Sequence, residues 1–406
     1  MNTDLNIVVI IDRYLPIFGG AQNNVHELCR RLTRDGYKVN ILTRRIYKWM
    51  QCNEEMDEVK ITRLGYSPVR VISKLLCFLY ILIYLINKRN YYDIVLSVPC
   101  VETTDLLPAY ISSMLTKKPY VIRLTGFPTF YAIPLSTKRT LWSRIMETLL
   151  PKNYWLKMMR RASAVVAQSS VLKEALDPYS IEKCEVISNG VDFKRFNVPG
   201  ELEKNSLRKK YDYPEDKVVI INTGRYDRDK NQITLIKAAE YIEKSVMPGK
   251  VYVLIIGATQ RNQLTSNEDE IKQYVNNRGL GSFIKFIDDV DGVENYLKAA
   301  DIFCHPTIDE GMSNALIEAM ACGLPIICSD IPQEVCMFPE GEGLFHKPHD
   351  HDSLVIHLKE LITSKELRKS YGDMLSTYAR EKYSNDTLSK MYADLFRNII
   401  NDDRSA

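Results

Sequence analysis

The sequence predicts an α/β protein with two domains, each built on a parallel sheet. In both halves, short apolar segments typical of buried strands alternate with amphipathic segments typical of helices, and this alternation indicates parallel sheets. The length of 406 residues suits two such domains. The predicted strands of the first half are 7–11, 38–43, 94–97, 120–124, 164–167 and 185–187. Those of the second half are 218–222, 251–256, 283–286, 302–305 and 325–329.

A polar, charged stretch at residues 194–217 separates the two halves. It contains Pro199-Gly200 and a segment rich in Glu and Lys, and we interpret it as a linker. We therefore expect domains at residues 1–197 and 198–383.

Composition and charge exclude several classes of protein. Hydrophobic residues make up 45% and charged residues 26% of the chain, which is ordinary for a globular protein with buried cores. The net charge of +3 is too small to indicate a nucleic-acid partner. The nine cysteines include no CxxC pair, which favours a reducing compartment. The N-terminus lacks the basic start and long apolar run of a signal peptide, so we expect a cytoplasmic protein.

The first candidate site follows the predicted strand 218–222. There, Gly224 permits a tight turn, Arg225 can bind phosphate oxygens in a bidentate manner, and Lys230 adds a cation near the start of a helix. Ligands bind outside the carboxyl ends of such strands. Taken alone, this pattern also fits a solvated loop.

The second candidate site lies between the predicted strand 302–305 and the helix 314–321. A helix capped by Ser313 or Asn314 would present free backbone N–H groups to an anion. Glu310 lies in the loop beside this point. Glu318 lies one turn into a largely apolar helix and needs a polar partner, either a ribose diol or a neighbouring cation. His305, at the end of the strand, is interpreted as a packed or capping residue. The amides expected to contact the anion are those of Gly311, Met312, Ser313 and Asn314.

The run from Glu310 to Glu318 resembles the E-x7-E motif of retaining glycosyltransferases with the GT-B fold, family 4 type. Gly224-Arg225 with Lys230 resembles the diphosphate clamp of that family. The remaining similarities span most of the chain: Gly19-Gly20-Ala21, Ile187-Ser188-Asn189-Gly190-Val191-Asp192, Gly257 and Ala321-Cys322-Gly323-Leu324-Pro325.

The resemblance implies a fold and an activity. It implies two Rossmann-like domains facing each other across a donor cleft, with a C-terminal helix, residues 384–406, packed on the first domain. It implies retaining transfer of a sugar from a nucleotide-diphosphate sugar to a glycan or lipid-linked acceptor, in surface polysaccharide or glycolipid synthesis. No cofactor and no metal would be needed, because cations and a helix end replace the metal.

The resemblance also implies residue roles. Arg225 and Lys230 would stabilise the leaving diphosphate, and Glu310 would contact the donor sugar near the reacting carbon. Glu318 would hold the ribose. The remaining donor contacts would come from backbone at Gly19, Gly20, Gly224, Gly311, Met312, Ser313 and Asn314.

One departure concerns the acceptor. Many relatives have His-Gly where this chain has Thr125-Gly126, so we expect Thr125, with Arg123 on the same side of the strand, to contact the acceptor. The missing histidine leaves other interpretations open. They are a catalytically silent nucleotide-sugar-binding or membrane scaffold subunit, or another reaction on the same fold, such as a sugar phosphorylase or a nucleotide-sugar epimerase.

Two segments invite a membrane interpretation. Residues 75–86 contain no charge and predict either a helix buried against the first sheet or partial insertion into a membrane face. Residues 138–161 hold seven Lys or Arg against one Glu, interleaved with tryptophans. They predict either contact with an anionic membrane surface, at the inner face of the cell membrane, or a covering helix with a solvated basic face.

Overall fold

The computed structural model describes residues 5–17, 19–99, 106–126, 154–257, 266–288 and 290–405. These residues form two compact units. Unit 1 comprises residues 1–189 together with 385–406, and unit 2 comprises residues 190–384.

Unit 1 is built on a sheet whose strand order is β3-β4-β2-β1-β5-β6-β7-β8. All neighbouring pairs are parallel except β3 with β4. Strands β1 and β5 are almost entirely buried, as expected of strands covered on both faces. The strands are β1 (Asn6–Ile11), β2 (Lys38–Arg44), β3 (Asn53–Met56), β4 (Val59–Leu64), β5 (Ile94–Ser97), β6 (Tyr120–Arg123), β7 (Ala164–Ala167) and β8 (Cys184–Val186).

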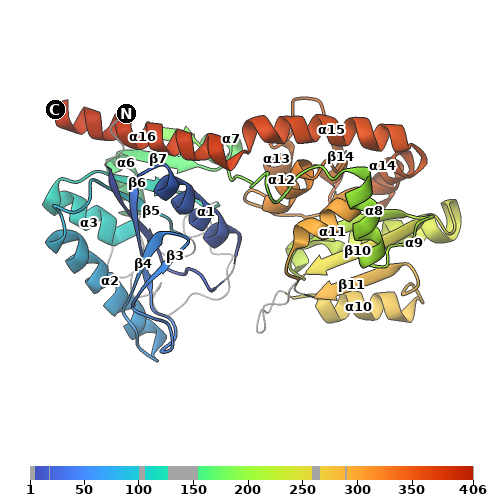
Figure 1. Cartoon of the computed structure of the whole chain (residues 1–406), viewed down its shortest axis with the longest axis horizontal. Coiled ribbons are helices and arrows are strands. Elements are labelled where there is room, and N and C mark those ends of the chain that lie inside the picture. Colours follow the sequence, from blue (N-terminus) through green and yellow to red (C-terminus); the bar gives the residue numbers. More distant parts are fainter. Residues whose placement is uncertain are drawn as a thin grey trace. The chain divides into compact units, whose positions relative to one another are not determined.

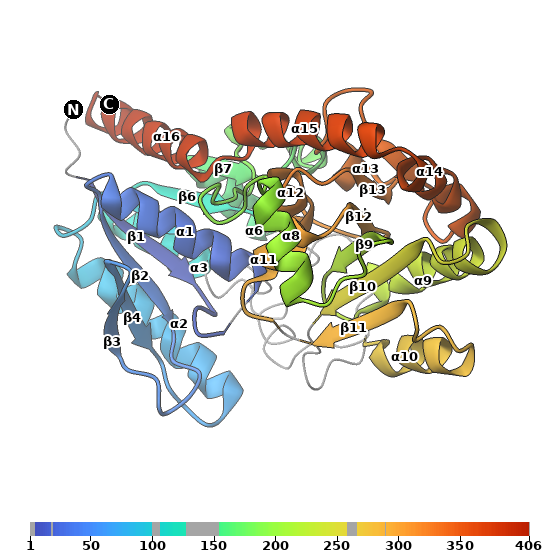
Figure 2. The ribbon, with the colours of Figure 1, turned by 45° about the vertical axis from the view of Figure 1, so that its right-hand side comes forward.

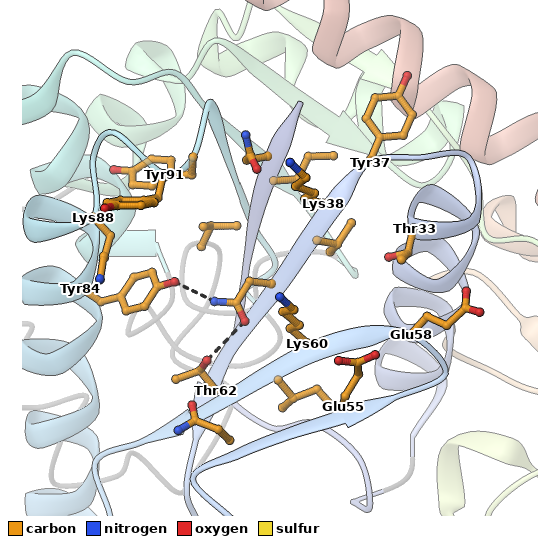
Figure 3. Close-up of a pocket in the computed structure, with 18 of the residues that line it drawn as sticks. Thr33, Tyr37, Lys38, Glu55, Glu58, Lys60, Thr62, Tyr84, Lys88 and Tyr91 are labelled. Carbon is orange, nitrogen blue, oxygen red and sulfur yellow. Dashed lines mark hydrogen bonds between the residues drawn. The ribbon is translucent and has the colours of Figure 1, made fainter. Parts of the chain in front are cut away.

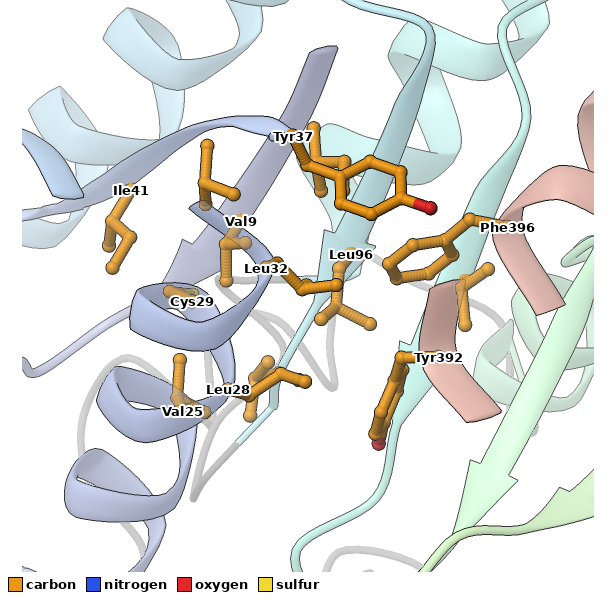
Figure 4. Close-up of a cluster of buried hydrophobic side chains, with 14 of the residues drawn as sticks. Val9, Val25, Leu28, Cys29, Leu32, Tyr37, Ile41, Leu96, Tyr392 and Phe396 are labelled. Carbon is orange, nitrogen blue, oxygen red and sulfur yellow. The ribbon is translucent and has the colours of Figure 1, made fainter. Parts of the chain in front are cut away.

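Helices cover both faces of this sheet (Figures 1 and 2). On one face, α1 (Gly20–Arg34) and the C-terminal α16 (Asn385–Ser405) pack against β1 and β5, as the cluster in Figure 4 shows. In that cluster Tyr392 and Phe396 of α16 lie beside Leu28 and Leu32 of α1. The other face is covered by α2 (Arg70–Asn87), α3 (Leu106–Thr116), α6 (Tyr154–Arg161), α7 (Ser170–Glu174) and the short turn η1 (Asp177–Tyr179).

Unit 2 is built on a second sheet, all parallel, in the order β11-β10-β9-β12-β13-β14. Its strands are β9 (Val218–Thr223), β10 (Val251–Gly257), β11 (Ile284–Asp288), β12 (Ile302–His305), β13 (Ile326–Ser329) and β14 (Leu344–His346). Its helices and helical turns are α8 (Glu201–Lys210), η2 (Arg228–Lys230), α9 (Gln232–Tyr241), η3 (Ile242–Val246), α10 (Glu268–Asn277), α11 (Val293–Ala299), α12 (Asn314–Ala321), α13 (Pro332–Val335), α14 (His351–Thr363) and α15 (Lys365–Lys382).

The predicted linker is wrong, because residues 194–217 belong to unit 2. Phe196 and Tyr213 are buried in the core of that unit. Asp301 accepts from Lys204 Nζ and Arg208 Nη2, both at 2.8 Å, which anchors α8 to the sheet. The division between the units therefore falls at 189/190 rather than 197/198. Polar helices of this kind resemble linkers in composition, and only their long-range ion pairs distinguish them.

The basic segment 138–161 is described only in part. Residues 138–153 lie outside the described residues. In α6, Trp155, Met158 and Met159 are buried in the core of unit 1. Trp155 is therefore a packing residue, which contradicts the interpretation that it faces a membrane.

Candidate active site

The first predicted motif lies in the loop that follows β9. The backbone N–H of Gly224 donates to the Ile256 carbonyl of β10 at 2.9 Å. Gly257, at the end of β10, lies so close that a Cβ there would overlap the Gly224 carbonyl oxygen and lie 3.1 Å from Tyr226 Cζ. Glycine at 257 is thus required by a close backbone approach rather than by an unusual φ.

Arg225 is an exposed cation of this loop. Its side chain is 47% exposed, and its guanidinium lies 3.8 Å from the Asp227 carboxylate. Its carbonyl accepts from Gln232 Nε2 at 2.8 Å, which anchors the backbone while the side chain extends into solvent. The preceding Thr223 Oγ1 is buried and has no hydrogen-bond partner within the described parts of the chain. Such a group is a natural contact for a ligand.

The two predicted motifs meet at the carboxyl edge of the second sheet. Lys230 of η2 forms an ion pair with Glu310, and the two side chains are only 16% and 19% exposed. The backbone N–H of Ile308 and the hydroxyl of Thr307 both donate to the Asp229 carbonyl, at 2.8 and 2.7 Å. These bonds hold the loop after β12 against the loop after β9, although the two lie about eighty residues apart in sequence.

The pKa values of two neighbouring carboxyl groups at this edge, Asp309 and Glu310, are shifted in opposite directions. Burial raises the pKa of Glu310, but the neighbouring Lys230 and His305 outweigh it and hold the pKa below its ordinary value. Burial raises the pKa of Asp309, and the carboxylates of Asp229 and Glu310 add to that rise. Glu310 is therefore ionised at neutral pH, paired with the lysine.

Behind this pair lies a buried polar pair that the sequence analysis missed. His305 Nδ1 is hydrogen-bonded to Glu334 of α13, and both side chains are almost completely buried. The Ser329 backbone N–H donates to the other Glu334 oxygen at 3.1 Å. Burial raises the pKa of Glu334, and His305 opposes that rise. From the sequence we expected His305 to be a packed or capping residue, without a named partner. The signal that could have identified the partner is Glu334 itself, an acidic residue within the largely apolar segment after β13.

The second motif begins α12 as predicted. Ser313 is the N-cap, and its Oγ accepts from the Leu316 backbone N–H at 3.3 Å. Gly311 and Met312 precede the cap, and Asn314 is the first residue of the helix. The first turn contains no acidic residue, so the positive end of the helix is not neutralised by its own side chains.

Glu318 lies in the second turn of α12 and is partly buried. Burial raises its pKa to about 7, against the opposing effect of Arg195 and with a further rise from Glu294. Arg195 and Glu294 are themselves ion-paired at 2.8 Å. The structure thus brings Arg225, Lys230 and Glu310 to one edge and gives Glu318 a separate pair of charged neighbours.

In unit 1, the predicted glycines begin α1. Gly19 is the N-cap of this helix, with an extended backbone, and its carbonyl accepts from the Asn23 backbone N–H at 3.0 Å. Gly20 is the first helical residue, and the first turn contains no acid. This helix N-terminus lies after β1, at the carboxyl edge of the first sheet.

The two predicted acceptor residues differ in exposure. Arg123 is buried, donates to Asn189 Oδ1 at 3.0 Å and lies over the Tyr392 ring at 5.5 Å. Its side chain is therefore committed to packing between the end of β8 and α16. Thr125 is partly exposed, and its hydroxyl donates to the Pro99 carbonyl at 3.3 Å. Contact with an acceptor stays a prediction for Thr125.

A cavity of about 580 Å³ in unit 1 is remote from these residues (Figure 3). It lies at the amino ends of β1 and β2, the edge opposite to the predicted site. Asn40 Nδ2 donates to Tyr84 Oη at 2.8 Å, and Thr62 Oγ1 donates to Asn40 Oδ1 at 3.3 Å, so these lining groups satisfy one another. Among the described residues, no group of three or more His, Cys, Asp or Glu side chains is arranged to hold a metal ion.

Comparisons with known proteins match this architecture. The family model described as Glycosyltransferase Family 4 matches residues 18–195, and that described as Glycosyl transferases group 1 matches residues 203–377. An uncharacterized glycosyltransferase of Methanocaldococcus jannaschii is 22% identical over 98% of this chain and 99% of its own.

Two further proteins are similar to this chain. The UDP-Gal:alpha-D-GlcNAc-diphosphoundecaprenol alpha-1,3-galactosyltransferase of Escherichia coli is 29% identical over 53% of this chain and 55% of its own. The solved structure of a sucrose-phosphate synthase from Thermosynechococcus elongatus superposes with a TM-score of 0.79 at 18% identity, covering 98% of this chain and 99% of its own. The predicted family and fold class are confirmed: the chain belongs to the group 1, family 4 type of glycosyltransferases and has the GT-B fold.

Proposed function

We propose that this glycosyltransferase transfers a sugar, with retention of anomeric configuration and without a metal ion, from a nucleotide-diphosphate sugar to a glycan or lipid-linked acceptor. We place it in the cytoplasm, in surface polysaccharide or glycolipid synthesis. The similarity to a galactosyltransferase whose name specifies a UDP-sugar donor and a diphosphoundecaprenol-linked acceptor supports this choice of substrates.

One observation supports the donor site most strongly: the loops after β9 and β12 bring two cations and an ionised carboxylate to the edge where α/β proteins bind ligands. Lys230 is held by its ion pair with Glu310, so its orientation is fixed before any ligand arrives. Arg225 is about half exposed, at 47%, and extends from an anchored backbone. Thr223 adds a buried hydroxyl at the same strand end, which no group in the described residues hydrogen-bonds.

In the proposed reaction, the bond between the anomeric carbon and the diphosphate breaks, and negative charge accumulates on the leaving phosphate. Arg225 and Lys230 stabilise that charge with their positive side chains, which is the role a metal ion has in other enzymes. The N-terminus of α12, with the amides around Ser313, adds partial positive charge. Glu310 contacts hydroxyls of the donor sugar, and Glu318 accepts hydrogen bonds from the ribose.

A diphosphate bound next to Glu310 would place two negative groups close together. The contributions of Lys230 and Arg225 to neutralising the diphosphate therefore differ. Lys230 already neutralises Glu310 and so compensates only part of the incoming charge. The contact of Arg225 with Asp227 is long, at 3.8 Å, so its side chain can reorient onto the phosphates. We therefore expect Arg225→Ala to weaken donor binding more than it weakens the fold, and Lys230→Ala to weaken both.

Thermal unfolding with a panel of nucleotides and nucleotide sugars, in the presence of EDTA, tests the proposal. A nucleoside diphosphate at 100 times its dissociation constant should stabilise the protein by about 2.7 kcal/mol. The shift should disappear in Arg225→Ala and should persist in the control Arg368→Ala, which removes a cation of unit 2 outside the site. If no nucleotide raises the melting temperature, or if binding requires a divalent cation, the metal-independent donor site is wrong.

Transfer assays then separate an enzyme from a silent subunit. Thr125→Ala should lower the rate of transfer at unchanged nucleotide affinity, because Thr125 lies in unit 1, whereas Arg225, Lys230 and Glu318 lie in unit 2. Nucleotide binding without transfer to any lipid-linked or free glycan would favour a catalytically silent subunit.

A further inference from the structure

Helix α2 exposes an apolar face in unit 1. Ile72, Leu75, Leu79 and Ile83 are 48, 44, 41 and 51% exposed. Their spacing of three, four and four residues places them along one side of an α-helix. Tyr80, 50% exposed, widens the same region. Single exposed apolar residues are ordinary, but a continuous row along an entire helix indicates a surface that contacts something.

The opposite face of α2 is part of the core. Cys77, Ile81 and Leu85 are buried against the sheet, and the Ser73 hydroxyl donates to the Gly65 carbonyl at 2.7 Å. By length and composition, α2 is the one helix among the described residues that could cross a membrane. Its buried face argues against crossing, since the helix would have to leave the core of unit 1. The exposed face is instead available to a surface that α2 lies along.

The charged residues of α2 and of the segments that flank it in sequence are all cationic. Residues 66–92 contain no Asp or Glu. Arg70 is exposed at the start of α2, and Lys88 and Arg89 are exposed just after its end. The neighbouring α3 packs against α2 and is followed by the exposed Lys117. An apolar row about 17 Å long thus has cations beyond both ends.

We propose that this face of α2, defined by Ile72, Leu75, Leu79, Tyr80 and Ile83, docks on the surface of a lipid bilayer that contains anionic lipids. The helix lies in the plane of the interface, its apolar row enters the boundary of the acyl chains, and the terminal cations contact lipid phosphates. This proposal does not depend on the proposed reaction.

Charge favours a bilayer over a second copy of the chain as the occupant. In a two-fold pair the same patch is used twice, so each α2 would face another α2. In either orientation the cations of Arg70, Lys88 and Arg89 would then meet cations of the partner, which is unfavourable. An anionic bilayer offers hydrocarbon to the apolar row and phosphates to both ends at once.

Co-sedimentation of the whole protein with vesicles tests the proposal. We expect binding to vesicles of phosphatidylcholine containing about one third phosphatidylglycerol, weaker binding to phosphatidylcholine alone, and weaker binding as salt rises. The variant Leu79→Gln/Ile83→Gln should bind about tenfold more weakly. Lys88→Gln/Arg89→Gln should lose about fivefold for each charge on anionic vesicles only. All four positions are exposed, so thermal unfolding should be unchanged, and this is checked first.

A matched control variant replaces two exposed apolar residues by Gln on a different surface of the protein. Leu202→Gln/Ile356→Gln alters two exposed apolar residues of unit 2, 87 and 59% exposed, and should bind vesicles as the wild type does. The proposal is overturned if the wild type stays in the supernatant with anionic vesicles at low salt. It is equally overturned if Leu79→Gln/Ile83→Gln binds like the wild type, because the binding surface would then lie elsewhere. A variant that only dissociates a dimer, at unchanged vesicle binding, would assign the face to a second copy instead.

Discussion

The carboxyl of Glu318 provides a quantitative test of the site, because its pKa is raised from 4.5 to about 7 by burial. A raised pKa means that the folded protein binds this proton more tightly than the unfolded chain does. Stability from this group is therefore complete below pH 4.5 and is lost as the pH rises to 7. At 1.36 kcal/mol per pH unit, the loss between pH 5 and pH 8 is about 2.5 kcal/mol.

Glu318→Gln removes this titration while keeping the shape of the side chain. We expect the stability of the variant relative to the wild type, as the difference in free energy of unfolding, to be about 2.5 kcal/mol greater at pH 8 than at pH 5. Urea unfolding followed by circular dichroism gives this difference. The three tryptophans, Trp49, Trp142 and Trp155, lie in the sequence outside unit 2. Tryptophan fluorescence therefore reports the unfolding of unit 1 and should show no pH-dependent difference.

The control for Glu318 is Glu340→Gln, which changes an exposed glutamate of the same unit. It should alter stability equally at both pH values. The reasoning is refuted if Glu318→Gln and Glu340→Gln behave alike. A wild type that gains stability between pH 5 and pH 8 relative to Glu318→Gln would show that the Arg195 charge outweighs burial and lowers the pKa.

Three further changes test individual contacts. Gly257→Ala pushes a methyl group into the Gly224 carbonyl and should cost about 1–3 kcal/mol and weaken nucleotide binding, whereas Gly281→Ala, which meets open space, should do neither. Arg123→Ala should lower the fluorescence-detected stability of unit 1 by about 2–4 kcal/mol; lost transfer at full stability would instead mean that Arg123 contacts the acceptor. Glu310→Ala should slow transfer about 100-fold or more while nucleotide binding persists, and transfer at the wild-type rate would remove Glu310 from the proposed mechanism.

The sequence predicted those features that local patterns determine. The strands 251–256 and 302–305 differ from the observed β10 and β12 by at most one residue, because buried parallel strands are continuous apolar runs bounded by turn residues. The start of α12 was predicted from residue type and position, with Ser313 or Asn314 as its N-cap, and Ser313 is the one observed. The edge strands β3 and β14 were not predicted; β3, with the sequence Asn-Glu-Glu-Met, lacks the continuous apolar run of a buried parallel strand.

Long-range pairing in the site could not be predicted. The sequence showed that Glu318 needed a polar partner, but nothing local identified its charged neighbours Arg195 and Glu294, and Arg195 lies more than a hundred residues away. In the same way, the pairing of His305 with Glu334 depends on the adjacency of β12 and β13. The burial of a helix also depends on residues distant in sequence. The apolar segment of α2 predicted a helix, but its packing against the sheet determines which face is buried and which stays exposed.

The position of α2 within unit 1 connects the two proposals. A helix that follows a parallel strand begins at the carboxyl edge of the sheet, so the Arg70 end of α2 lies at the edge that also holds Gly19 and Thr125. A bilayer lying along the exposed face of α2 would reach that edge. A lipid-linked acceptor would then enter along the membrane surface instead of leaving it, so the cost of extracting its chain into water is avoided. Under this argument, Leu79→Gln/Ile83→Gln should slow transfer to a vesicle-embedded acceptor but not to a soluble analogue, because the donor site in unit 2 is unchanged.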